Sequence, residues 1–272
     1  MNRFFFIVWH YLKRATRDFK EIALLIAIPL GVTIFTTLMV GEMTSDMEWP
    51  GLNGYNVFAS HMAPAFVLSF QFFNSFFMFI FLYSDFRGAM RWRLLAAPCP
   101  VRSFVFPAFI ANWILSLALG VVLIVLATLI LNIYWGSLFV LAVVLALISL
   151  MATFIAVLIF LFTHKLAQAN AVGYVVSFGL MILSGFMVPL QVFGDNFLTR
   201  FLTTYGTPLS LGSSAIVSSG ELSGFFDDFN VILPGVSVGD GVRNPLINIG
   251  ILAAITTVLG LSTVIAARRR KI

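Results

Sequence analysis

The sequence has few charged residues. Only 10% of its 272 residues are Asp, Glu, Lys or Arg, whereas 60% are hydrophobic. Soluble domains carry roughly 25% charged residues, so this composition excludes an ordinary soluble fold. It predicts a polytopic membrane protein.

Cysteine and histidine are also scarce. Cys99 is the only cysteine, which excludes an intramolecular disulfide and a Cys-rich metal site and predicts a reduced cytosolic thiol. His10, His61 and His164 are dispersed over three segments, and no H-E-x-x-H motif occurs. We therefore expect no metal in this chain.

Six apolar segments are long enough for the roughly 30 Å hydrocarbon core, and none contains Asp, Glu, Lys or Arg. They are residues 22–40, 63–84, 104–133, 138–163, 171–190 and 245–267. Ion-coupled carriers usually keep ionisable residues at membrane depth, so the chain is expected to draw energy from elsewhere. It has no G-x-x-x-x-G-K-[ST] phosphate loop, which indicates an ATPase partner on the cytoplasmic side.

The basic residues lie almost entirely on one side of these segments. Fourteen of the 16 are in the N-terminal segment, the loop after the second span, the link after the fourth and the C-terminus, and only Arg200 and Arg243 lie opposite. The positive-inside rule therefore predicts cytoplasmic termini, in a plasma or inner membrane. The net charge of +5 would also suit nucleic acid, but the basic residues border apolar runs, so no nucleic-acid partner is expected.

Residues 1–21 are predicted to form an amphipathic helix along the inner leaflet. The apolar residues of this segment recur at steps of three and four, and its charged residues share the other side. The apolar set is Phe4, Val8, Tyr11, Ala15 and Phe19. The alternative is a plain extension of the first span into the cytoplasm.

Residues 85–103 combine basic and large apolar side chains between two uncharged spans. They predict a short cytoplasmic helix that has a surface to dock against, and Pro98 and Pro100 end it. The candidate contact residues are Arg87, Arg91, Trp92, Arg93, Leu94 and Leu95. Simple attachment to the membrane is the alternative.

Residues 191–244 are too long, and in their first half too apolar, for an ordinary loop. We expect two short helices, 197–204 and 209–218, to form an outward-facing re-entrant hairpin around a break at 205–208. The remainder predicts exposed irregular chain. No separate soluble domain is expected, so residues 1–272 form a single transmembrane domain.

Alternatives from other functional classes are a membrane-embedded enzyme, an ATP-independent channel and a structural subunit. Residues 235–239 match G-x-S-x-G, but the turn-rich surroundings lack the strand and helix of a nucleophile elbow. No catalytic residue is therefore assigned. Gln71 and Asn74 are the strongest polar pair within a span and fit either helix packing or a cargo contact.

Two stretches are similar to motifs of a known family, the permease subunits of ABC-2-type exporters. Residues 89–98, AMRWRLLAAP, resemble that family's G-T-x-x-R-L-L-A-x-P segment and depart from it at Ala89 and Met90. Residues 184–189, SGFMVP, resemble its fifth-span signature through Gly185 and Pro189, with Tyr205 and Pro208 downstream.

The resemblance implies an all-α membrane domain with six spans, in which residues 85–103 are the coupling helix of a separate ATPase. ATP and Mg²⁺ would bind that partner and not this chain. A second permease chain, identical or homologous, would complete the transport route. The phenylalanines of the second span form helical stripes, which suit contact with lipid. The alternative is that a stripe faces an amphiphilic or lipophilic cargo, with Gln71, Phe73, Asn74 and Phe77 along the cargo path.

Overall fold

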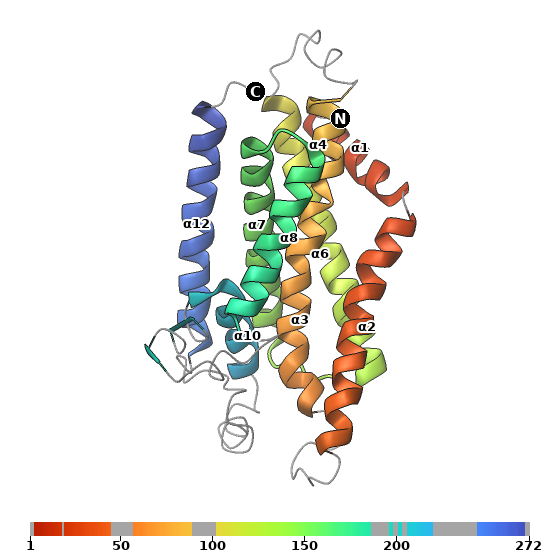
Figure 1. Cartoon of the computed structure of the whole chain (residues 1–272), viewed down its shortest axis with the longest axis vertical. Coiled ribbons are helices and arrows are strands. Elements are labelled where there is room, and N and C mark those ends of the chain that lie inside the picture. Colours follow the sequence, from red (N-terminus) through yellow and green to blue (C-terminus); the bar gives the residue numbers. More distant parts are fainter. Residues whose placement is uncertain are drawn as a thin grey trace.

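The computed structural model describes residues 3–17, 19–44, 57–88, 102–185, 196–197, 201–202, 206–219 and 244–269. Over these described residues its main elements are nine helices, and the long ones stand side by side as a bundle (Figure 1). They are α1 (Arg3–Arg17), α2 (Phe19–Thr44), α3 (Val57–Phe76), α4 (Met78–Phe86), α6 (Arg102–Leu131), α7 (Leu138–Phe162), α8 (Leu166–Leu183), α10 (Pro208–Ser218) and α12 (Pro245–Arg269).

The expected class, an all-α integral membrane protein, is confirmed. Among the described residues, five helical stretches are long and apolar enough to cross a membrane, and a sixth is added when α1 and α2 count as one bent span. The five are Met62–Phe86, Val105–Leu131, Leu138–Phe162, Leu166–Leu183 and Pro245–Arg268. They correspond to the last five predicted spans.

Two of these spans differ in detail from the prediction. The fifth predicted span, residues 171–190, corresponds to α8, which begins earlier, at Leu166. Its described part ends where Gly185 takes a φ of 80°, a conformation that suits glycine after a helix. The second span, Met62–Phe86, is continuous but locally irregular at Phe77, where the Phe77 amide donates to the Asn74 carbonyl (3.3 Å) and the Ile80 amide to the Phe77 carbonyl (3.3 Å). These bonds span three residues instead of four, so the helix tightens there.

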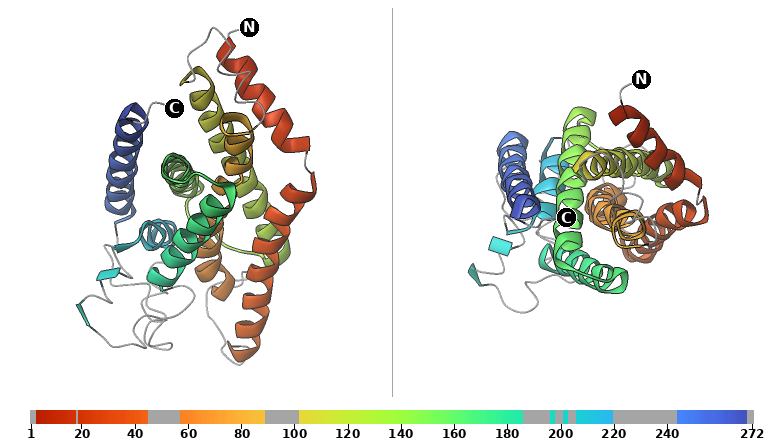
Figure 2. Two further views of the ribbon diagram at one scale, coloured as in Figure 1. Left: turned by 45° about the horizontal axis from the view of Figure 1, so that its top comes forward. Right: turned by 90° about the horizontal axis from the view of Figure 1, so that it is seen from above.

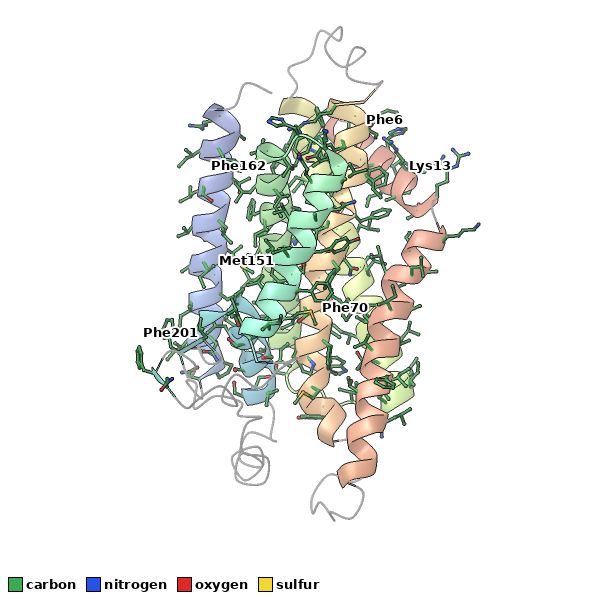
Figure 3. The ribbon with its side chains drawn as sticks, viewed as in Figure 1. Phe6, Lys13, Phe70, Met151, Phe162 and Phe201 are labelled. Carbon is green, nitrogen blue, oxygen red and sulfur yellow. The ribbon has the colours of Figure 1, made fainter. Side chains whose placement is uncertain are left out.

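Helix α7 is the centre of the bundle. It packs against α3, α6, α8, α10 and α12, and the view from above shows α12 and α10 on one side of it and α3 and α6 on the other (Figure 2). Val144, Ile148, Ala152 and Ala156 have no exposed surface. Met151 also points into the bundle (Figure 3).

Polar side chains join α3, α6 and α7 within the core. The Ser116 hydroxyl donates to the Gln71 side-chain carbonyl (2.8 Å), and the Asn112 amide donates to the Ser75 carbonyl and the Thr153 hydroxyl, each at 3.3 Å. Gly120 makes room, because a Cβ there would lie 2.5 Å from the Gln71 amide nitrogen. These bonds fix the register of the three helices.

Helix α1 is directed away from α2. The segments Phe4–Arg17 and Ile22–Thr36 differ in direction by 65°, so α1 does not continue α2 in a straight line. The apolar face that the periodicity identifies is buried at Val8 and Ala15, but it packs along α6 and is not the exposed face of the helix. Lys13 and Phe6 are exposed, and Lys13 projects away from the bundle (Figure 3).

Helix α10 lies at the opposite end of the bundle from α1 (Figure 1). It matches the second arm of the predicted hairpin, whereas the first arm, 197–204, lies mostly outside the described residues. The Thr207 hydroxyl caps α10 by accepting from the Ser210 amide (3.2 Å), and Pro208 occupies its first turn. A Cβ at Gly212 would lie 2.8 Å from Leu68, so glycine permits close packing on α3.

Candidate functional site

The candidate site is the end of α4, where the second span leads into the 85–103 segment. Its first residues, Asp85 to Gly88, are described. The remaining predicted contact residues lie outside the described residues: Arg91, Trp92, Arg93, Leu94 and Leu95. The contacts described below are therefore those at the start of the 85–103 segment.

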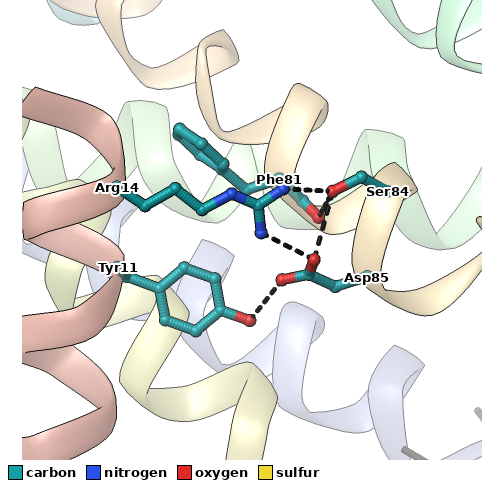
Figure 4. Close-up of polar contacts among 5 residues, drawn as sticks. All are labelled: Tyr11, Arg14, Phe81, Ser84 and Asp85. Carbon is teal, nitrogen blue, oxygen red and sulfur yellow. Dashed lines mark hydrogen bonds and ion pairs between the residues drawn. The ribbon is translucent and has the colours of Figure 1, made fainter. Parts of the chain in front are cut away.

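Asp85 joins α4 to α1 (Figure 4). Its carboxylate accepts from the Tyr11 hydroxyl (2.9 Å) and from the Arg14 guanidinium (2.7 Å). Arg14 also donates to the Ser84 hydroxyl (2.8 Å), and its guanidinium lies 5.0 Å from the centre of the Phe81 ring. Two residues one helical turn apart on α1 thus hold a single acidic side chain.

The ion pair between Asp85 and Arg14 is partly withdrawn from solvent. The Asp85 side chain is 10% exposed, so its charge depends on the groups that bond it, whereas the Arg14 side chain is 37% exposed and its charge is also stabilised by solvent. Burial, and then the Asp85 carboxylate, raises the pKa of Tyr11 well above its usual range. Tyr11 therefore remains a protonated donor at any physiological pH.

Arg87 joins the same end of α4 to α7. Its guanidinium donates to the backbone carbonyls of Thr163 and Phe160, the latter at 3.1 Å. The rings of Tyr83 and Phe160 lie 5.0 and 4.9 Å from it, and the Tyr83 hydroxyl also donates to the Thr163 carbonyl (3.0 Å). The last carbonyls of a helix lack partners within the helix and carry partial negative charge, so an arginine is well matched to them.

A small cavity lies between α1, α4 and α6. Its volume is about 20 Å³, and its lining is mostly apolar with Asn112 as a polar member. About 10–15 Å³ suffices for one water molecule, so the cavity is far too small for an amphiphilic cargo.

The predicted cargo residues have different environments. Gln71 and Asn74 are buried on α3, and Phe77 is buried in a cluster with residues of α1, α2 and α6. Phe73 is partly exposed, and its ring lies 6.2 Å from that of Tyr174 and 5.4 Å from that of Phe178.

Most of the phenylalanine stripes pack inside the bundle. Only Phe70 and Phe73 are partly exposed, and the buried members are Phe66, Phe72, Phe76, Phe77, Phe79 and Phe81. The structure thus adds Tyr174 and Phe178 of α8 as neighbours of Phe73, a contact that no sequence period could indicate.

The fifth-span signature and the residues downstream of it are only partly described. Gly185 and Pro208 are described, and Pro189 and Tyr205 lie outside the described residues.

Comparison with protein families identifies the architecture. The family model for the ABC-2 type transporter matches residues 4–220, which include the α4 end and its contacts with α1 and α7. The chain belongs to the ABC-2 type transporter family. It is a multi-pass membrane permease domain and is not itself catalytic. A comparison with curated proteins and one with solved structures each gave no match.

We expect the Asp85 contact to stabilise the permease. Asp85→Asn should lower the free energy of unfolding by about 1.5–3 kcal/mol, the range for hydrogen bonds to a charged group. Combining it with Arg14→Gln should cost less than the sum of the two single changes, with an interaction energy of about 0.5–3 kcal/mol. Unfolding of the four proteins in mixed micelles measures this.

Arg17 provides the control because it is an exposed basic residue on the same helix. Arg17→Gln combined with Asp85→Asn should be additive within about 0.3–0.5 kcal/mol. Equal coupling of Asp85 to Arg14 and Arg17 would show that general charge, and not the observed pair, is responsible.

Proposed function

We propose that this permease is the membrane-spanning subunit of an ABC exporter. It moves an amphiphilic or lipophilic compound outward, driven by ATP hydrolysis in a separate nucleotide-binding subunit. The observation that carries the proposal is the anchoring of the α4 end to both α1 and α7, at the entry to the 85–103 segment. Family members generally act with ABC ATPase subunits and form dimers, so a second permease chain completes the complex.

The 85–103 segment is the proposed ATPase-docking element. Its Arg91 and Arg93 can form charge-assisted hydrogen bonds to acidic groups of the ATPase, while Trp92, Leu94 and Leu95 can fill an apolar groove. ATP and Mg²⁺ belong to that partner. The absence of charge from the six predicted apolar segments supports this energy source, since ion-coupled transport usually requires ionisable groups at membrane depth.

Reversing the charge of Arg91 and Arg93 should weaken ATPase docking. The Arg91→Glu/Arg93→Glu permease should retain its fold but bind its ATPase at least tenfold more weakly, because losing two charge-assisted bonds exceeds the 1.4 kcal/mol of one decade. Titration of ATPase onto reconstituted permease measures this. Arg268→Glu, at an exposed position on α12, is the charge-matched control. Unaltered affinity with full export in the double variant would refute the docking assignment.

The proposed orientation puts the α1 end of the bundle in the cytoplasm and α10 near the outer surface. Helix α1 then lies along the inner leaflet. Its exposed Phe5 and Trp9 would meet acyl chains and its exposed Lys13 and Arg17 anionic headgroups. The α10 helix, with the chain before it, would form the re-entrant hairpin.

Thiol labelling tests this orientation. An impermeant maleimide added to intact cells should leave Cys99 unmodified and should label Gly224→Cys in a Cys99→Ser background. Permeabilised cells are the control in which both thiols should react. Labelling of Cys99 from outside would reverse the assignment.

The partly exposed aromatic group on α3 and α8 is the proposed cargo-facing surface. It consists of Phe70, Phe73, Tyr174 and Phe178. Apolar rings with one phenolic hydroxyl suit an amphiphile, which needs mainly apolar contacts and a few polar ones. Gln71 and Asn74, on the buried part of the same helix, would serve cargo only if the permease opens there.

Substitutions at two phenylalanines should separate cargo contact from packing. In a reconstituted permease–ATPase complex, Phe73→Ala should raise the amphiphile concentration for half-maximal ATPase stimulation roughly tenfold, the effect of one lost apolar contact. Phe77→Ala should chiefly lower thermal stability, since Phe77 is buried against Phe81, with ring centres 5.2 Å apart. Stimulation constants unchanged in Phe73→Ala for a broad amphiphile panel would remove this surface from the cargo route.

A further inference from the structure

The bonds of Arg87 run within the chain. Both terminal nitrogens of its guanidinium donate to carbonyls at the end of α7, and the rings of Tyr83 and Phe160 lie against it. Both terminal nitrogens and the ring contacts of this guanidinium are thus used within the chain, which favours an internal role over contact with an ATPase. This differs from the docking role that the sequence predicts for Arg87.

We propose that Arg87 is a positioning residue that fixes the 85–103 segment to the carboxyl end of α7, so that α7 carries movement of this segment to α10. The inference rests on the proposed function and assigns one of its internal connections. Arginine suits the role because its planar fork can reach two carbonyls at once, whereas the single ammonium of lysine cannot match that geometry.

The properties of α7 suit it to transmit a displacement. It is one unbroken helix of 25 residues, about 37 Å long at 1.5 Å per residue. Its buried face includes Val144, Ile148 and Ala152, which have no exposed surface, so it cannot bend or shift without repacking its neighbours. Arg87 contacts the carboxyl end of this helix.

The other end of α7 contacts α10. The Ser137 amide, immediately before α7, donates to the Ser219 hydroxyl at the end of α10 (3.1 Å). A Cβ at Gly212 would lie 3.1 Å from Val144, so the two helices pack closely along their sides as well. A shift of α7 along its axis would therefore displace α10.

The experiment uses the permease purified with its native ATPase in a Cys99→Ser background. Ser218→Cys on α10 is the reporter, and its maleimide reaction rate is compared between nucleotide-free and vanadate-trapped complex. The amount of ATPase bound per permease is measured on the same samples. The variants are Arg87→Gln and Arg87→Lys, and the control is Lys165→Gln, an exposed basic residue next to the end of α7.

Arg87→Gln should keep the ATPase bound but reduce the nucleotide-dependent change in reaction rate at least about fivefold, the lower range of coupling between distant sites. Arg87→Lys should give an intermediate change, and Lys165→Gln should behave like the parent. A purely structural role would instead lower the melting temperature and leave the nucleotide response of the folded fraction intact.

A full nucleotide response in folded Arg87→Gln would overturn the proposal. Loss of ATPase binding in that variant would also overturn it, because Arg87 would then belong to the docking surface. If Arg87→Gln fails to fold, an undiminished response in Arg87→Lys decides against the bidentate contact. A parent permease that binds no ATPase contradicts the proposed function itself, which separates the two failures.

Discussion

A bilayer offers no hydrogen-bond partners to buried polar groups, so they must find partners within the protein. In the described part of this bundle, many of these partners lie within the same helix. Many serine and threonine hydroxyls return to a carbonyl one turn earlier in their own helix, as Thr153 does to Ser149 and Thr256 to Leu252. Such bonds lie within one helix, so they need no partner from a neighbouring helix. They leave apolar surface and small residues to determine how the helices pack.

The turn around residues 71–75 of α3 departs from this pattern. Among the described residues, the Gln71 amide nitrogen, the Asn74 side-chain carbonyl and the Ser75 hydroxyl are buried without a hydrogen-bond partner in the protein. They directly precede the irregularity at Phe77. On one side of it α3 is bonded to α6 through Gln71, and on the other α4 is bonded to α1 through Asp85 and its end to α7 through Arg87.

Length and hydropathy are sufficient to predict the last five spans because a hydrocarbon core admits only long apolar helices. The buried face of α1 follows equally from its period. The local irregularity at Phe77 could not be predicted, since neither proline nor glycine stands there. The phenylalanine stripes show the limit of periodicity. A period identifies which residues share a face, but the neighbours of that face depend on how helices distant in sequence pack.

The role of Arg87 illustrates the same limit for charge. In the sequence it is one of four basic residues in a loop, indistinguishable from Arg91 and Arg93 as a docking residue. Its preference for α7 arises because chain folding brings the carbonyls of Phe160 and Thr163, at the end of α7, beside it. Since Arg14 is likewise bonded to Asp85, the basic residues nearest the bundle are used to hold it together. Under the proposed function, contact with an ATPase is therefore assigned to residues beyond Gly88, and Asp85 and Arg87 to the attachment of the segment to α1 and α7.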